Sequence, residues 1–225
     1  MFLRVVWLVL RKDVAIEAKT REILYTTLFF AVACVLVFSF AFVKEGQPVE
    51  GAGVGILWIA IIFSGNLALG RTFERERYSE TLRALLLAPA PRPALYLGKL
   101  LGMLALLGIA EVILVPMVAF LFQATLFSRP LLLAGLLAGG TIGFSAVGTL
   151  FAAMLVRARS RDVLLPILLY PITIPVIIAG VRGTAALLAP TPDEATAGMW
   201  IGILTAFDVV FVTLALWTFE PLMTE

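Results

Sequence analysis

Six long apolar runs dominate this chain and decide what it can fold into. A hydrocarbon core about 30 Å thick needs roughly 20 largely apolar residues in each helix that spans it. Six stretches approach or exceed that length and occupy most of the 225 residues. Their approximate bounds are 23–43, 54–69, 97–122, 131–156, 163–179 and 200–219. The sequence therefore predicts an all-α integral membrane protein, with six transmembrane helices in a single domain over residues 1–225.

Composition excludes several classes of protein. Hydrophobic residues make up 61% of the chain and charged residues only 14%, whereas an ordinary soluble domain is about 45–50% apolar. The 17 Lys and Arg are nearly matched by 15 Asp and Glu, which argues against nucleic-acid binding. With no His and one Cys, the chain cannot build a His/Cys metal site or an intrachain disulfide. It also lacks the Gly-x-x-x-x-Gly-Lys-Ser/Thr loop that cradles nucleotide phosphates, so we expect no catalytic residue, no metal and no directly bound cofactor.

The basic residues predict the orientation of the spans, because Lys and Arg beside a span resist translocation. Fourteen of them lie before the first span, between the second and third, or between the fourth and fifth. The opposite side holds only Lys44, Arg129 and Arg182. Both termini are therefore predicted to be cytoplasmic.

Residues 1–21 form an amphipathic pattern ahead of the first span. On a helical wheel Arg4, Arg11, Lys12 and Lys19 fall within one arc. The opposite side carries Phe2, Val6, Val9, Leu10, Val14 and Ile16. Such a helix would lie in the headgroup plane, either as a topology anchor or as a surface for a partner.

The cytoplasmic segment 71–95 carries the most informative charge pattern. Acidic and basic residues alternate at every third position, namely at Arg71, Glu74, Arg77, Glu80 and Arg83. On a helix such neighbours pair with one another, and Leu82, Leu85 and Leu86 give that helix an apolar side. Pro89, Pro91 and Pro93 then end it. The segment is predicted to be a short amphipathic helix, which could be only a solvated connection between spans.

The order of residues in that segment resembles the cytoplasmic signature of ABC-2-type exporter permeases. The resemblance rests on Glu76, Ser79–Leu82, Leu85–Leu87, Pro89 and Leu97–Lys99. In that family the region docks onto the ATPase subunit as a coupling helix. The resemblance implies an ATPase-facing surface made by Glu74, Arg75, Glu76, Glu80 and Leu82.

A closer resemblance is to the CcmB family, the haem exporter permeases of cytochrome c maturation. It rests on Gly55-Ile-Leu-Trp-Ile-Ala, on Leu67-Ala-Leu-Gly-Arg-Thr-Phe and on the proline-rich stretch 165–179, and it extends over nearly the whole chain. It implies a permease subunit of the bacterial inner membrane, working as a homodimer with a CcmA-like ATPase that binds ATP. CcmC-like, CcmD-like and CcmE-like haem-handling partners are implied as well. Haem would be a transported or handled ligand, and ATP hydrolysis would drive either its export or release of the haem-loaded chaperone.

Prolines and glycines mark two spans independently of any family. Pro166, Pro171 and Pro175 each remove a helical hydrogen bond, so the fifth span is predicted to be kinked or interrupted, either in a substrate path or in a packing helix. In the fourth span, glycines recur at four-residue spacing and permit close helix contact. These glycines are Gly135, Gly139 and Gly143. A packing seam within the chain is favoured over a dimer interface.

Two carboxylates fall inside spans, Glu111 in the third and Asp208 in the sixth. An ionised side chain at the bilayer centre costs at least about 2.5–3.5 kcal/mol, and no Lys or Arg lies at comparable depth. Each is therefore expected to be either protonated and hydrogen-bonded or facing a hydrated cavity. They mark either a functional interior or a structural hydrogen bond.

Other functions remain open at the level of sequence. The chain could be an ABC-2 exporter of another substrate, or an ion-coupled secondary transporter that uses Glu111 and Asp208. It could also be a membrane scaffold that only holds partners. Dependence on ATP hydrolysis by a partner separates the ABC permeases from the other two.

Overall fold

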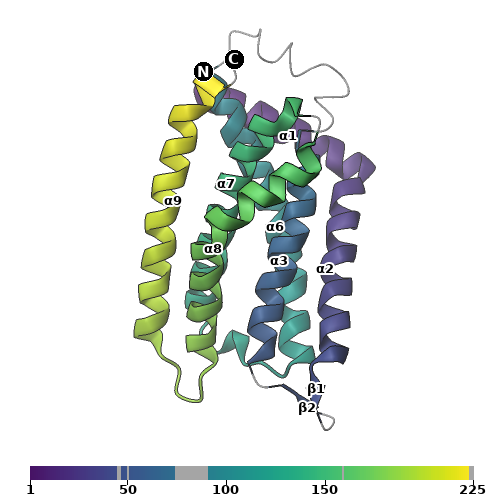
Figure 1. Cartoon of the computed structure of the whole chain (residues 1–225), viewed down its shortest axis with the longest axis vertical. Helices are drawn as coiled ribbons and strands as arrows, with labels where there is room; N and C mark the ends of the chain where they lie inside the picture. Colours follow the sequence, from purple (N-terminus) through teal and green to yellow (C-terminus); the bar gives the residue numbers. More distant parts are fainter. Residues whose placement is uncertain (45–46, 50, 74–90, 159, 223–225) are drawn as a thin grey trace.

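The computed structural model describes residues 1–44, 47–49, 51–73, 91–158 and 160–222. Within these ranges the chain forms seven α-helices, a two-stranded hairpin and two short 3₁₀ helices (Figure 1). The α-helices are α1 (Phe2–Thr20), α2 (Glu22–Ala41), α3 (Ala52–Arg71), α6 (Arg92–Leu121), α7 (Pro130–Met154), α8 (Arg161–Leu188) and α9 (Glu194–Leu222). The remaining elements are β1 (Val43–Lys44), β2 (Gln47–Pro48), η1 (Leu126–Ser128) and η2 (Leu155–Arg157).

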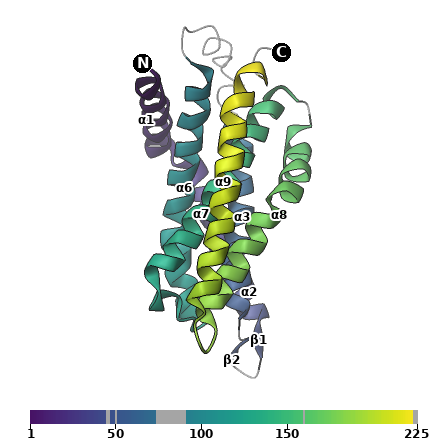
Figure 2. The same cartoon turned by 90° about the vertical axis from the view of Figure 1, so that its left-hand side faces the viewer.

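Six of the described helices, α2, α3, α6, α7, α8 and α9, form a bundle of membrane spans. Each is long and apolar enough to cross a bilayer, and in Figures 1 and 2 they run side by side along the long axis of the molecule. The start of α1 and the C-terminal end of α9 lie at one end of the bundle, and the β1–β2 hairpin lies at the other. The predicted all-α, six-span membrane fold is confirmed.

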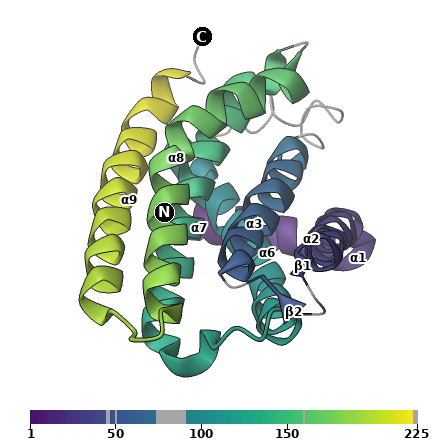
Figure 3. The ribbon, with the colours of Figure 1, turned by 60° about the horizontal axis from the view of Figure 1, so that its bottom comes forward.

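The spans differ in how much of their surface the bundle covers. In α3 and α7, 67% and 61% of the most apolar stretch is buried, whereas the corresponding figures for α2 and α9 are 22% and 11%. Figure 3 shows α9 and α2 on opposite outer sides, with α3 and α7 between them. Much of the apolar surface of α2 and α9 is therefore on the outside of the bundle, where lipid would lie. Exposed leucine and phenylalanine side chains cost no free energy there, because lipid tails are as apolar as they are.

Helix α1 crosses the end of the bundle and packs on α6. Val6 and Val9 are buried, and the contact is close because α6 presents Gly98: a Cβ there would lie 2.7 Å from the Cβ of Val9. The predicted apolar side is only partly used in this contact, since Val14 is 49% exposed. Trp7, at 61% exposure, adds a large apolar side chain that the bundle does not cover.

Helix α8 extends well beyond the predicted fifth span. The apolar run was expected to end at residue 179, but the helix continues to Leu188. Pro166, Pro171 and Pro175 all lie inside it, and the helix is unbroken while its axis bends, as Figures 1 and 2 show. Helix α9, which forms the sixth span, likewise begins at Glu194, six residues before the predicted apolar run.

Candidate functional site

The C-terminal end of α3 is held by two buried cations from neighbouring helices. Lys99 of α6 donates from Nζ to the carbonyl oxygen of Thr72 at 3.0 Å. Arg161, at the start of α8, donates from Nη2 to the carbonyl oxygen of Leu69, also at 3.0 Å. The last carbonyls of a helix have no partner within the helix and carry partial negative charge, so cations stabilise them.

Lys99 also connects this point to α1. Its Nζ lies 3.0 Å from Oδ2 of Asp13 and 5.2 Å from the centre of the Phe73 ring. Only 6% of the Lys99 side chain and 3% of Phe73 are exposed. Asp13 contacts Lys12 as well, at 3.1 Å. A buried ammonium is tolerated only with such partners, and here they come from α1 and from the end of α3.

A third, exposed contact fixes the same end of α3 to α2. Arg71 Nη1 lies 2.9 Å from Oε1 of Glu22. Residues 69–73 are thereby attached to α1, α2, α6 and α8 immediately before the charged segment of the sequence begins. We call Leu69, Thr72, Phe73, Lys99 and Arg161 the α3 clamp.

The residues predicted to face an ATPase follow the α3 clamp directly in the chain. Glu74, Arg75, Glu76, Glu80 and Leu82 all belong to residues 74–90, which lie outside the described residues. The described chain resumes at Pro91, and α6 begins at Arg92. Arg92 donates from Nη1 to the carbonyl oxygen of Glu220, near the end of α9, at 3.4 Å.

The two intramembrane carboxylates lie on different sides of α7. Glu111 of α6 accepts a hydrogen bond from Oγ1 of Thr141. Asp208 of α9 lies over Gly143, where a Cβ would be 2.7 Å from its Oδ1. Positions two apart on a helix are about 200° apart, so Glu111 and Asp208 do not share a site. Within the described part of the chain, Oδ1 of Asp208 is buried and has no hydrogen-bond partner.

The three predicted packing glycines face α9 of the same chain. A Cβ at Gly135 would lie 3.1 Å from Ile201, and one at Gly139 would lie 3.0 Å from Leu204. Gly143 continues this line to Asp208. The glycine stripe is thus occupied by an intrachain neighbour.

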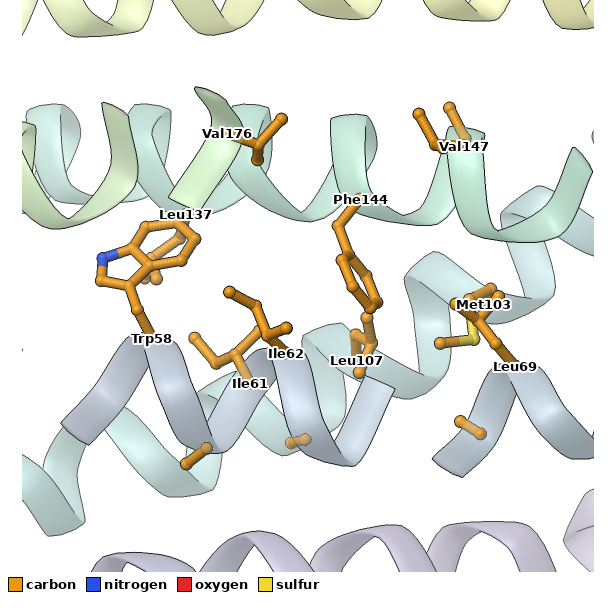
Figure 4. Packing of buried hydrophobic residues seen from close by; sticks show 14 of the residues in the cluster. Trp58, Ile61, Ile62, Leu69, Met103, Leu107, Leu137, Phe144, Val147 and Val176 are labelled. Atoms are coloured by element: carbon orange, nitrogen blue, oxygen red, sulfur yellow. The ribbon is translucent and has the colours of Figure 1, made fainter. Parts of the chain in front are cut away.

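Sequence reasoning missed a tryptophan contact in the middle of the bundle. Trp58 of α3 is 1% exposed, and its ring lies against Gly140 of α7 and Gly180 of α8. Its Nε1 donates to Oγ1 of Thr184 at 3.1 Å. Figure 4 shows the Trp58 ring beside Leu137 and Val176, with Phe144 projecting from α7 toward Leu107.

The buried cations of the α3 clamp were also missed. Lys99 and Arg161 stand at the edges of apolar runs; both counted as topology signals, and Lys99 was also part of the ABC-2 resemblance. The available signal was a cation next to a long apolar run. The partner of Lys99 lies 27 residues away in the sequence, and that of Arg161 lies 92 residues away. Among the described residues, no group of three or more His, Cys, Asp and Glu could hold a metal ion.

Comparison with known proteins identifies the family. Residues 4–221 match the family model described as "CcmB protein". The chain belongs to the CcmB family. Curated relatives in this family include "Heme exporter protein B" of Pseudomonas aeruginosa, 28% identical over 87% of this chain and 86% of the relative. The protein of the same name from Paracoccus denitrificans is 30% identical over 79% of this chain and 80% of the relative. The protein of the same name from Haemophilus influenzae is 26% identical over 92% of this chain and 91% of the relative.

The CcmB match covers the elements that the sequence resemblance relied on. It extends from α1 through the six spans and includes the segment 74–90. The predicted resemblance to the CcmB family is confirmed.

Proposed function

We propose that this chain is the membrane permease subunit of an ABC transporter complex for cytochrome c maturation. In this proposal a separate, CcmA-like ATPase hydrolyses ATP, and the permease couples hydrolysis to haem export or to release of a haem-loaded chaperone. The observation that carries the proposal is the CcmB match over residues 4–221, whose curated relatives bear the name heme exporter. Haem is then a handled ligand, and ATP binds to the partner.

The α3 clamp supports a mechanical role for the permease. A displacement of the segment that follows Phe73 would reach α1 through the Lys99–Asp13 pair. It would reach α8 through Arg161 and the carbonyl of Leu69. An ATPase acting on residues 74–90 would therefore move several helices together.

The proposed orientation places the α3 clamp and both termini on the cytoplasmic side, where ATP is available. The clustering of basic residues at this end supports that orientation. We further propose a homodimeric permease with CcmC-like, CcmD-like and CcmE-like partners, in the bacterial inner membrane.

Charge reversal in the proposed coupling segment tests the assignment. Glu76→Lys combined with Glu80→Lys should lower co-purification of the ATPase about tenfold or more, because reversed charges at an interface repel their former partners. Insertion of the permease should be unchanged. A matched control is Glu45→Lys with Glu50→Lys, the same change in the segment between the first two spans. Undiminished ATPase association in the Glu76/Glu80 variant would refute the coupling surface.

We propose a role in the transport cycle for Asp208 rather than for Glu111. Glu111 has a hydrogen-bond partner in Thr141, whereas the buried Oδ1 of Asp208 has none among the described residues. Asp208→Asn should reduce complementation of cytochrome c maturation, and Glu111→Gln should reduce it less. Full complementation by Asp208→Asn, at wild-type protein levels, would show that this carboxylate has no part in transport.

A further inference from the structure

A cavity of about 540 Å³ lies where α1 crosses the bundle, between α1, α2, α3 and α6. Its lining joins two kinds of surface. Charged side chains come from α1, from the α1–α2 junction, from the end of α3 and from Lys99 of α6, and apolar residues come from all four helices. The apolar part includes Gly102, Met103, Ala105, Leu106 and Ile109.

Among the described residues, few side chains cover the outer part of the α6 wall. A Cβ added at Gly102 would approach only Leu10, at 3.9 Å. Ala105 is exposed, and Ile109 is 48% exposed. An apolar wall does not hold ordered water, so a wall of this kind inside a membrane span suits a hydrocarbon chain.

The rim of the cavity has an excess of cations. Lys12, Arg21, Arg71 and Lys99 line it, against Asp13 and Glu17. Both carboxylates already have partners: Asp13 contacts Lys12 and Lys99, and Glu17 accepts from the backbone N–H of Leu24 at 2.8 Å.

Arg21 is the cation with the clearest capacity for an anion. Its guanidinium donates to neutral oxygens, the carbonyl of Ala18 and the hydroxyl of Tyr25. Among the residues that the structure describes, no carboxylate forms an ion pair with it. It stands at the junction between α1 and α2, with a left-handed φ of 54°, beside the first N–H groups of α2. The N–H of Leu24 already donates to Glu17, and the guanidinium of Arg21 favours a further anion.

We infer that this cavity is a binding site for an anionic phospholipid, whose phosphate lies at Arg21 and whose acyl chain lies along Gly102, Ala105 and Ile109. The order of the two parts fits such a molecule, because α1 crosses the bundle at the end of the spans while the α6 wall runs into the hydrocarbon. The lipid would fill the space between α1 and α2 beside the α3 clamp. The inference needs only the membrane placement of the bundle and does not depend on which ATPase the chain binds.

The direct test is native mass spectrometry of the full chain, purified in a delipidating detergent. Dioleoyl phosphatidylglycerol is added, and dioleoyl phosphatidylethanolamine and inorganic phosphate are added in parallel samples. We expect retained phosphatidylglycerol, weaker binding of phosphatidylethanolamine and no binding of phosphate alone. Each removed cation should weaken phosphatidylglycerol binding about fivefold.

Two pairs of variants separate a site from general lipid adhesion. Arg21→Gln should lower phosphatidylglycerol binding, whereas Lys19→Gln, an exposed neighbour that does not line the cavity, should not. Gly102→Leu should exclude the acyl chain. Gly108→Leu, on the same helix with no atom within 4 Å of its Cβ position, should not.

Several outcomes would overturn the inference. These are equal binding of the two lipids, equal effects of Arg21→Gln and Lys19→Gln, and binding of phosphate alone at the same strength. Hemin that displaces the lipid and is itself lost with Gly102→Leu would assign the cavity to a different amphiphile. If Gly102→Leu fails to fold, Ala105→Phe supplies the same measurement. A failed ATPase pull-down would leave every one of these results unaffected.

Discussion

The middle of the bundle and the C-terminal end of α3 fix the same helix by different forces. In the middle, Trp58 lies against Gly140 and Gly180, and no charge is involved. At the end, Lys99 and Arg161 bind the last carbonyls of α3. Close packing against glycine needs no desolvation of charge and suits the hydrocarbon core. Buried cations need a dense set of partners, so they occur where α1 and the helix end supply them.

This difference indicates how each region responds to change. A packed glycine contact tolerates almost no added volume, because interiors have few voids. A charged clamp tolerates a change in shape but not the loss of one partner, since the other charge is then left unpaired. The middle is therefore expected to set the stability of the bundle, and the α3 clamp to set the position of the chain that follows it.

The largest effect is expected from Gly180→Leu. A Cβ at this position would lie 2.5 Å from the Trp58 ring, and the larger side chain cannot be accommodated without separating α3 from α8. We expect the free energy of unfolding to fall by more than the roughly 1–3 kcal/mol typical of overpacking, which is enough to prevent folding. Size-exclusion chromatography and thermal unfolding in detergent would measure it. The control is Gly202→Leu on α9, where a Cβ meets no atom within 4 Å; equal damage by both would contradict the role of Trp58.

A smaller effect is expected from breaking the buried ion pair with Lys99→Met. Asp13 keeps 24% exposure and can recover some hydration, so we expect a loss of about 2 kcal/mol, below the range for fully buried pairs. The double variant with Asp13→Asn should cost less than the sum of the two single variants, which a double-mutant cycle would reveal. Strict additivity would mean that the two side chains do not interact.

An exposed ion pair at the other end of the bundle should matter less. Arg129 pairs with Glu194, and about half of each side chain is exposed. Arg129→Gln is expected to cost about 0.5 kcal/mol or less, because water solvates both charges. Thermal unfolding of Arg129→Gln and Lys99→Met under the same conditions compares the two ends of the bundle. A larger loss of stability in Arg129→Gln would contradict the greater importance of the buried pair.

The smallest effect is expected at Asp193 and should depend on pH. Oδ1 and Oδ2 of Asp193 accept from the N–H and the hydroxyl of Thr196, which lowers the pKa of this exposed carboxyl. A lowered folded-state pKa gives stability that is present above the unfolded pKa of about 3.9 and is lost as pH falls through the folded value. Asp193→Asn should therefore match the wild type at the acid end and be slightly less stable near neutral pH. Unfolding curves that differ equally at all pH values would contradict this origin.

Much of the architecture could be predicted from hydropathy. The first span was expected at 23–43 and α2 occupies Glu22–Ala41; the second was expected at 54–69 and α3 occupies Ala52–Arg71. These boundaries could be predicted from the local sequence, because each apolar run stops where charged residues begin. The fifth span was underestimated because Gly180, Arg182 and Gly183 interrupt its apolar run.

The candidate site was less predictable than the fold. The charge pattern of segment 71–95 led to the prediction of an ATPase-facing surface, but the residues predicted to form it lie outside the described residues, so this stays a prediction. The α3 clamp needed contacts from α6 and α8 to the end of α3, and Lys99 of α6 needed Asp13 of α1. No periodicity in one segment can reveal such partners, since they depend on how distant helices pack.

The sequence by itself determined that the chain crosses a membrane six times, that an amphipathic helix precedes the spans and that a charged segment follows the second. These features follow from length, hydropathy and charge, which act locally along the chain. Only the tertiary structure decided what glycine does at particular places. Gly180 ends an apolar run in the sequence, yet in the bundle it admits Trp58 and the helix continues past it. A missing side chain weakens a helix in isolation, but between packed helices it allows an approach that no other residue permits.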